Sequence, residues 1–207
     1  MAFTSFANRL PDPAFKITEA GENSNSGLAG PGFASVKFSS EQPISVSRTN
    51  SGRVITRAIV SHVWKIQISY NPMTRDEFEP VYNFLLEKRG RLKPFFVKLP
   101  QHTPRTTTSS NYTLQGAHAA GVDNLLIDGV TPSTANLRPG DVFNISDSSN
   151  TNHKKLYQIV RVNDSTNKLS SDSALDQTTE RRLFIVPPLT RAVSNDSTLT
   201  YDTPLIR

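Results

Sequence analysis

The sequence predicts a mainly β protein of the α+β class, built from antiparallel sheets with one helix and a separate small β-barrel. Three observations predict this. Residues 33–70 alternate between apolar and polar types, residues 74–90 contain one well-marked helix signal, and residues 112–186 hold short strand patterns separated by polar turns. The hydrophobic content of 36% is low but still allows a core, and the many Ser and Thr residues favour strands and turns.

The first 32 residues are rich in Pro, Gly, Asn and Ser. Residues 20–32 are interpreted as a loop or arm, because so polar a segment buries too little surface to offset its own ordering entropy. In an assembling protein such an arm becomes ordered against a neighbouring subunit, and a simple frayed loop explains the composition equally well. No apolar run near the N-terminus has the length of a signal peptide.

The segment 33–70 is predicted to form strands. Residues 33–38 and 44–48 are short alternating runs, and a turn signal at 49–52 joins the second run to residues 53–60 as a hairpin. Residues 61–70 form the clearest strand, with polar residues on one face and apolar or aromatic residues on the other. Such an alternation predicts an antiparallel sheet with one buried and one solvated face. The apolar face carries His62, Trp64, Ile66, Ile68 and Tyr70.

Residues 75–89 are predicted to form a helix that lies against this sheet. Thr74 and Glu77 have the spacing of a capping box, Gly90 is a natural stop, and Pro80 is expected to bend the helix. An apolar stripe recurs with helical spacing, at Phe78, Val81, Tyr82, Leu85 and Leu86. The predicted core of this first domain consists of Trp64, Ile66, Ile68, Tyr70, Phe78, Val81 and Leu85.

The chain is predicted to have two domains. A further strand at residues 92–99 completes a first domain at 1–102, and the Thr-rich residues 103–111 are interpreted as a linker into a second domain at 103–189. We expect residues 190–207, with a last strand at 197–201, to return to the first domain. In that case the second domain is an insertion within the first. If residues 190–207 do not return, the second domain is appended to the first.

The second domain is predicted to be a small β-barrel. Its short strand patterns follow one another at intervals of roughly ten to fifteen residues, with polar loops and no helix signal between them. Strands are expected at residues 112–117, 124–127, 141–145, 156–162 and 183–186. Tyr112, Phe143, Tyr157 and Phe184 lie within these apolar runs and are core candidates.

The residue types that carry most enzyme chemistry are absent or scattered. The chain has no cysteine, which excludes disulfides, thiolate nucleophiles and cysteine metal sites. The four histidines lack the spacing of metal ligands, with His62 expected in the core and the other three in polar loops. No nucleophile elbow or phosphate-binding glycine motif is present. We therefore expect a non-enzyme with no catalytic residues, cofactor or metal; a hydrolase, supported only by scattered carboxylates, is the remaining catalytic alternative.

The net charge of +5 is moderately basic, and four basic residues cluster at the end of the helix. This cluster can meet phosphates or an acidic partner, or it can be a helix end that complements the dipole and is followed by a solvated strand. For nucleic acid we favour the second interpretation, and contact with a protein partner stays open. No run approaches ~18 apolar residues, so no membrane span is expected. The cluster consists of Lys88, Arg89, Arg91 and Lys93.

The order of several motifs resembles the tail proteins of tailed bacteriophages, in particular the distal tail and baseplate-hub group. In the first half the resemblance lies in Arg48-Thr49-Asn50-Ser51-Gly52, the strand with Trp64, residues 72–78, and Pro94-Phe95-Phe96-Val97-Lys98-Leu99-Pro100. In the second half residues 122–129, 137–145, 156–160 and 184–189 are similar to a small β-domain of phage virion proteins. The resemblance covers most of residues 33–190.

This resemblance implies a tail-tube-like antiparallel β-sandwich or barrel that forms a ring, usually hexameric, with an oligonucleotide/oligosaccharide-binding-like (OB-like) barrel projecting from it. It implies a structural virion protein, assembled in the host cytoplasm, that joins the distal end of the tail tube to the baseplate or fibres. The implied partners are copies of the chain, the tube protein and other hub proteins, with nucleic acid only as the genome passing through the lumen. The alternative is a carbohydrate- or nucleic-acid-binding module carried by the barrel.

Overall fold

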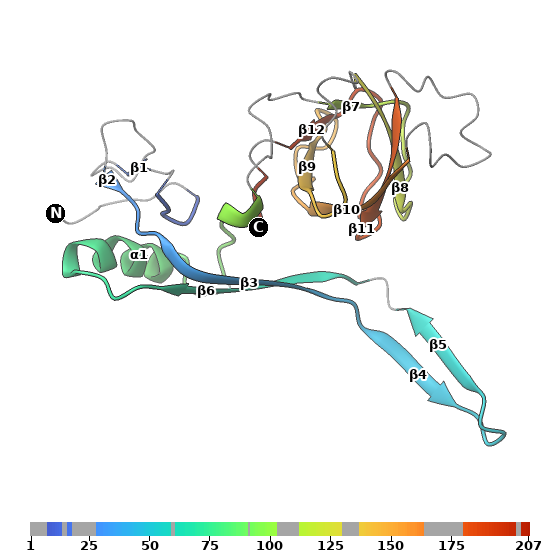
Figure 1. Cartoon of the computed structure of the whole chain (residues 1–207), viewed down its shortest axis with the longest axis horizontal. Helices are drawn as coiled ribbons and strands as arrows, with labels where there is room; N and C mark the ends of the chain where they lie inside the picture. Colours follow the sequence, from blue (N-terminus) through green and yellow to red (C-terminus); the bar gives the residue numbers. More distant parts are fainter. Residues whose placement is uncertain are drawn as a thin grey trace. The chain divides into compact units, whose positions relative to one another are not determined.

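The computed structural model describes residues 8–13, 16–17, 28–58, 61–90, 92–102, 112–129, 137–163, 180–201 and 204–207. These residues fall into two compact units, one between residues 11 and 90 and the other formed by residues 8–10 with those from 92 to 207. Antiparallel sheets and a single α-helix make up the described part of the chain, which confirms the predicted mainly β, α+β class (Figure 1). Most of the loop predicted at 20–32 and the linker predicted at 103–111 lie outside the described residues.

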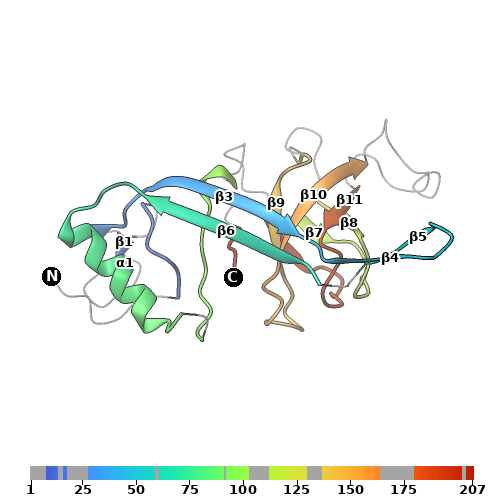
Figure 2. The same ribbon diagram turned by 90° about the horizontal axis from the view of Figure 1, so that it is seen from below.

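The first unit is built on an antiparallel ribbon of two strands, β3 (Phe33–Glu41) and β6 (Val63–Tyr70). A second hairpin, β4 (Ile44–Arg48) with β5 (Val54–Ala58), continues from one end of this ribbon and is called the arm below. Helix α1 (Arg75–Glu87) follows the other end of the ribbon (Figure 2). Among the described residues no third strand joins either hairpin, so the ribbon and the arm are both two-stranded.

The ribbon has one apolar and one polar face, as the sequence predicts. Trp64, Ile66, Ile68 and Tyr70 alternate with exposed residues, and the Trp64 ring stacks on Phe38 of the opposite strand with centroids 4.5 Å apart. These four predicted core residues are half-buried rather than buried, because two strands alone cannot cover a face completely. Burial raises the pKa of Tyr70 to about 12, so its hydroxyl stays protonated.

Helix α1 begins with the predicted capping box, in which the Thr74 amide donates to the Glu77 carboxylate at 3.0 Å. The buried face differs from the predicted stripe. Val81 is only 3% exposed and confirms the prediction, but Phe78 and Leu85 are 46% and 44% exposed, so their assignment to the core is wrong. Phe84, which the prediction omitted, is completely buried instead. Val81, Phe84 and Lys88 also have helical spacing, and the period alone does not choose between two overlapping stripes.

Gly30 follows the short pair β1 (Lys16–Ile17) and β2 (Leu28–Ala29) and passes close to another stretch of backbone. Its amide donates to the Asp12 carbonyl at 3.2 Å, and a Cβ at this position would lie 2.6 Å from the Asp12 nitrogen and 2.8 Å from the Pro11 carbonyl carbon. Backbone atoms cannot swing aside as a flexible side chain can. A glycine is therefore required at position 30, because the two backbone segments lie too close together for a Cβ atom.

Gly30→Ala is expected to lower the free energy of unfolding of the first unit by on the order of 1–3 kcal/mol, because the two backbone segments must separate. Urea unfolding followed by the fluorescence of Trp64, the one tryptophan of the chain, measures this. Gly32→Ala is the matched control, since the nearest atom to its Cβ is the Pro13 side chain at 3.7 Å. Equal unfolding midpoints for the two variants would contradict the prediction.

The second unit is a closed barrel of six antiparallel strands, one more than the five predicted. Around the barrel the order is β10-β11-β8-β7-β12-β9, and β9 pairs with β10 to close it. The added strand, β12, pairs with β7 on one side and β9 on the other. The strands are β7 (Tyr112–Leu114), β8 (Asn124–Asp128), β9 (Val142–Ser146), β10 (Leu156–Asn163), β11 (Arg181–Val186) and β12 (Thr198–Thr200).

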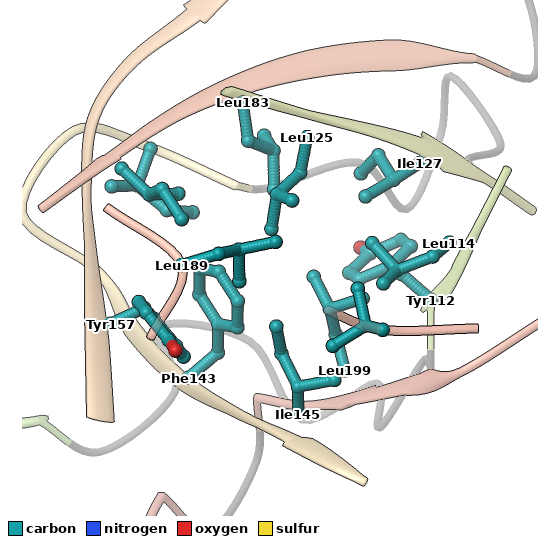
Figure 3. Packing of buried hydrophobic residues seen from close by; sticks show 13 residues of the cluster. Tyr112, Leu114, Leu125, Ile127, Phe143, Ile145, Tyr157, Leu183, Leu189 and Leu199 are labelled. Atoms are coloured by element: carbon teal, nitrogen blue, oxygen red, sulfur yellow. The ribbon is translucent and has the colours of Figure 1, made fainter. Parts of the chain in front are cut away.

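The barrel interior is filled by aliphatic and aromatic side chains from every strand (Figure 3). Three of the four predicted core aromatics, Tyr112, Phe143 and Tyr157, are buried there. Phe184 is not, because it is half-buried with the Arg161 guanidinium 3.9 Å from its ring centre. The interior cluster comprises Tyr112, Leu114, Leu125, Ile127, Phe143, Ile145, Tyr157, Ile159, Leu183, Ile185, Leu189, Val193 and Leu199.

The observed division of the chain differs from the expected one. The last strand, expected to return to a first domain with residues 190–207, instead closes the barrel as β12. The segment 92–99, expected as a strand of the first domain, makes only isolated bridges, such as that between Val97 and Ile206. The neighbouring Leu205 exchanges hydrogen bonds with the Asn144 side chain of β9. These contacts attach residues 92–99 to the barrel unit, which moves the boundary from residue 102 to residue 90.

A buried polar cluster joins two loops of the barrel. His153 is 2% exposed, and its Nε2 lies 2.7 Å from the Tyr157 hydroxyl, which also accepts a hydrogen bond from the Thr190 amide at 3.1 Å. The Asp147 carboxylate accepts one from the Ser194 amide at 3.1 Å. His153 thus lies in a polar loop, as predicted, but inside the protein rather than in solvent.

The second unit is expected to lose stability as the pH falls below about 6.5. Burial lowers the pKa of His153, and the charges of Arg191 and Lys154 act in the same direction, whereas Asp147 opposes them. Burial also lowers the pKa values of His102 and His118. The unfolded chain then binds more protons than the folded chain between the lowered and the ordinary pKa values, so stability falls by up to about 1.4 kcal/mol per pH unit for each histidine.

Hydrogen exchange of residues 142–163 at pH 7.5 and pH 5.5 measures this loss. The free energy of global opening, obtained from the exchange rates, is expected to be lower at pH 5.5 than at pH 7.5. His153→Gln is expected to reduce this difference in opening free energy between the two pH values. Gln keeps a hydrogen-bonding group near Tyr157 but does not titrate. If the opening free energy changed equally with pH in wild type and variant, the role given to His153 would be contradicted.

Candidate assembly surface

The described residues offer little for a chemical site. Within the described ranges no three His, Asp or Glu side chains gather as metal ligands. None of the helices described there is long and apolar enough to cross a membrane. What the first unit presents instead is exposed apolar surface, on the arm and on helix α1.

The arm is a hairpin whose apolar residues are left in solvent. Ile44, Val46, Val54 and Ile55 are 49–61% exposed, and the pairing register places the first three on the same face. Such β-branched residues favour extended backbone, which explains why the strands form. The turn between them is closed by the Thr49 amide, which donates to the Arg53 carbonyl at 2.9 Å, and by Gly52 at φ 81°.

The arm is also purely basic. Arg48, Arg53 and Arg57 lie within residues 44–58, and no carboxylate does, which gives the arm a net charge of +3. Arg48 shares the face of Ile44 and Val46, since it follows them at every second position of β4. The arm therefore combines an apolar face with a positive end.

Helix α1 exposes the apolar stripe that the sequence assigned to the core. Phe78, Tyr82, Leu85 and Leu86 are about half exposed, and the Phe78 and Tyr82 rings stack with centroids 5.3 Å apart. One carboxylate, Glu79, borders this stripe beside Leu86. With Asp76, Glu77, Glu87 and the single Arg75, the helix has four acidic residues against one basic, a net charge of −3.

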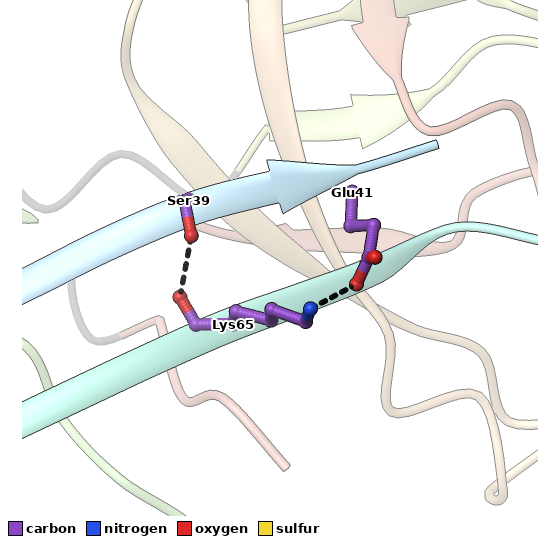
Figure 4. Close-up of polar contacts among 3 residues, drawn as sticks. All are labelled: Ser39, Glu41 and Lys65. Carbon is purple, nitrogen blue, oxygen red and sulfur yellow. Dashed lines mark hydrogen bonds and ion pairs between the residues drawn. The ribbon is translucent and has the colours of Figure 1, made fainter. Parts of the chain in front are cut away.

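The ribbon presents a polar face with a shallow depression. Lys37, Ser39, Lys65 and Gln67 line it together with part of Ile66. Lys65 pairs with the Glu41 carboxylate at 2.6 Å, and the Ser39 hydroxyl reaches the Lys65 carbonyl at 3.5 Å (Figure 4). Both groups of the ion pair are more than half exposed, so the pair orients the two side chains and adds little stability.

Among the described residues, only part of the predicted basic cluster is exposed to solvent. Lys88 is buried, with its ammonium group 5.0 Å from the Phe84 ring centre and 3.7 Å from the Glu87 carboxylate. Arg89 and Lys93 are exposed, and Arg91 lies outside the described residues. The end of the helix therefore carries fewer solvent-facing cations than the sequence suggests.

Sequence reasoning did not anticipate that the apolar residues of the arm and of helix α1 are exposed. Alternating Val and Ile in the arm, and an apolar stripe on the helix, are patterns that normally indicate burial. One signal was available in the arm, whose residues 44–58 contain three arginines and no acidic residue. Its basic character points to a partner surface rather than to a core.

Comparison with protein-family models and with curated protein sequences finds no match. The exposed apolar faces are therefore interpreted from their own chemistry. Two exposed apolar faces of opposite charge, both in the first unit, are the features that a function has to explain.

Proposed function

We propose that this protein is a non-enzymatic structural subunit that assembles with copies of itself into a ring. The observation that carries the proposal is the apolar surface left exposed on the arm and on helix α1. Monomeric soluble proteins rarely expose contiguous apolar patches beyond a few hundred Å², and larger ones usually mark interaction sites. Association with another copy removes both faces from water.

The two-stranded ribbons support the same proposal. An isolated two-stranded hairpin is marginally stable in water, and its outer edges hold backbone groups that can pair with another strand. Among the described residues β3 pairs only with β6, and β4 only with β5. Strands of neighbouring copies would extend these ribbons into a larger sheet, which the tail-tube-like fold of the proposed family also requires.

In this proposal the ring is hexameric and lies at the distal end of a phage tail tube, which it joins to the baseplate or fibres. The motif resemblance across residues 33–190 supports this placement. Copies of the chain, the tube protein and other hub proteins are the proposed partners, and the virion, assembled in the host cytoplasm, is the proposed location. The polar face of the ribbon is then free to line the lumen through which the genome passes.

The mass of the purified full chain tests the proposal. Analytical ultracentrifugation over a wide concentration range, with and without a candidate tube protein, is expected to show a closed oligomer, and electron microscopy of that species is expected to show rings. A chain that stays monomeric at every concentration and joins no tube would contradict the proposed function.

A nucleic-acid-binding barrel is the second candidate function. One observation favours it, because Arg161, Arg182 and Phe184 lie next to each other on paired strands, with Arg161 exposed and the other two half-buried. Arg161 covers the Phe184 ring, however, which leaves less of that ring for base stacking. Titration of the full chain with single-stranded DNA at low and moderate salt tests it; binding that weakens steeply with salt would support the barrel function. A parallel titration with neutral glycans tests the carbohydrate alternative.

A further inference from the structure

We propose that the arm of one copy docks on helix α1 of the next copy. This inference rests on the proposed ring function and specifies which surfaces meet. The arm and the stripe Phe78–Leu86 of the helix are different surfaces, so the contact is heterologous, running head to tail from copy to copy. Heterologous contacts generate a closed ring when the rotation between copies closes, which is the assembly proposed above.

Opposite charge selects the helix as the partner of the arm. The arm carries three arginines and no carboxylate, whereas helix α1 carries four carboxylates and one arginine. The net charges of +3 and −3 attract each other, while two arms, or two helices, repel. Charge complementarity of this kind favours the arm-to-helix pairing and speeds encounter between copies.

The apolar parts of the two surfaces also match. The arm face offers three side chains that are about half exposed, with Arg48 at its turn end, and the helix stripe offers four. Together the two faces hold on the order of 600 Å² of apolar surface, about the apolar share of the smallest stable protein interfaces. The arm face, led by Ile44 and Val46, would cover the stripe at Tyr82 and Leu86.

The arm cannot readily reach the helix of its own chain. The ribbon pairs Phe33 with Tyr70 at the helix end and Glu41 with Val63 at the arm end. These two ends are roughly 25 Å apart at the rise of a β-strand. The arm continues beyond the second end, while the helix follows the first (Figure 1). A second copy is therefore the natural occupant of both faces.

Charge reversal on each surface tests the contact. The arm variant Arg48→Glu/Arg53→Glu changes two exposed side chains of the arm, and the helix variant Glu79→Lys/Glu87→Lys changes two partly exposed carboxylates of helix α1. Each alone is expected to weaken self-association by about 10- to 100-fold, because like charges then face each other. An equimolar mixture of the two variants is expected to assemble again, since each arm then finds a helix of opposite charge in an alternating ring. Arg138→Glu/Lys154→Glu, on exposed residues of the barrel, is the matched control and is expected to assemble like wild type.

Sedimentation velocity on the full chains reads out all five samples, and equal thermal midpoints show that the variants are folded. Assembly of the wild type, loss in each variant and recovery in the mixture support the docking. Wild-type assembly that both variants retain, or a mixture that does not recover, overturns the arm-to-helix contact but leaves the ring function standing. A wild-type chain that never assembles overturns the ring function, and the docking with it.

Discussion

Phe143→Ala is expected to lower the free energy of unfolding of the barrel unit by about 3–5 kcal/mol, the range found when a buried aromatic is truncated. Phe143 is fully buried in β9, and its ring centre lies 5.9 Å from that of Tyr157 inside the barrel. Removing the ring leaves a cavity, and the strands of a closed barrel cannot easily move inward to fill it. Since a domain of this size is stable by only about 5–15 kcal/mol, the loss is a large part of the total.

Differential scanning calorimetry measures this effect as a drop in the melting temperature of more than ~10 °C. Phe184→Ala is the matched control, because the same side chain is removed from a half-buried position beneath Arg161. Its expected loss is below about 1.5 kcal/mol, since the site stays open to solvent. Equal losses for the two variants would mean that the barrel interior does not hold the unit together.

Leu86→Asp is expected to weaken self-association by at least ~100-fold while leaving the fold intact. Leu86 is 56% exposed in the single chain, so a charge there costs the folded monomer little. At an interface the same carboxylate loses its water without gaining an apolar contact, and a desolvated charge without a partner is strongly unfavourable. Sedimentation velocity compares the oligomer fraction with that of wild type.

Leu92→Asp provides the control for this substitution. Leu92 is more exposed still, at 68%, but it belongs to the other unit and lies outside both the arm and the helix stripe. Its replacement is expected to leave association unchanged. If both aspartate variants assemble like wild type, the helix stripe has no part in assembly.

Local patterns predicted the elements of this protein well. The strand alternation at 61–70 and the hairpin at 44–58 appear as β6 and as the arm, and the Thr74–Glu77 capping box starts α1 where expected. Each of these depends on residues close together in the chain, whose backbone preferences and spacing are legible in the sequence. The barrel strands were likewise marked by apolar runs between polar turns, and the buried Tyr112, Phe143 and Tyr157 follow from them.

Burial was harder to predict than secondary structure. Phe78 and Phe84 are both aromatic and sit on the same helix, yet only Phe84 is covered. Which of them faces inward depends on what packs against the helix, and that information lies in other segments of the chain. For the same reason Phe184 was expected inside the barrel, although its position in β11 is on the outer side.

The sequence by itself determined the mainly β class, the capped helix and the absence of cysteine chemistry, because these follow from residue types and from spacings within a few residues. Only the tertiary structure decided that β12 closes the barrel and that residues 92–99 belong with it, since both depend on pairing between distant segments. It also decided that the arm and the stripe of α1 remain uncovered. An apolar pattern in the sequence predicts that a face is buried, but not whether the same chain or another molecule covers it. The exposure of these two faces in the single chain is the reason for proposing a second copy as the partner.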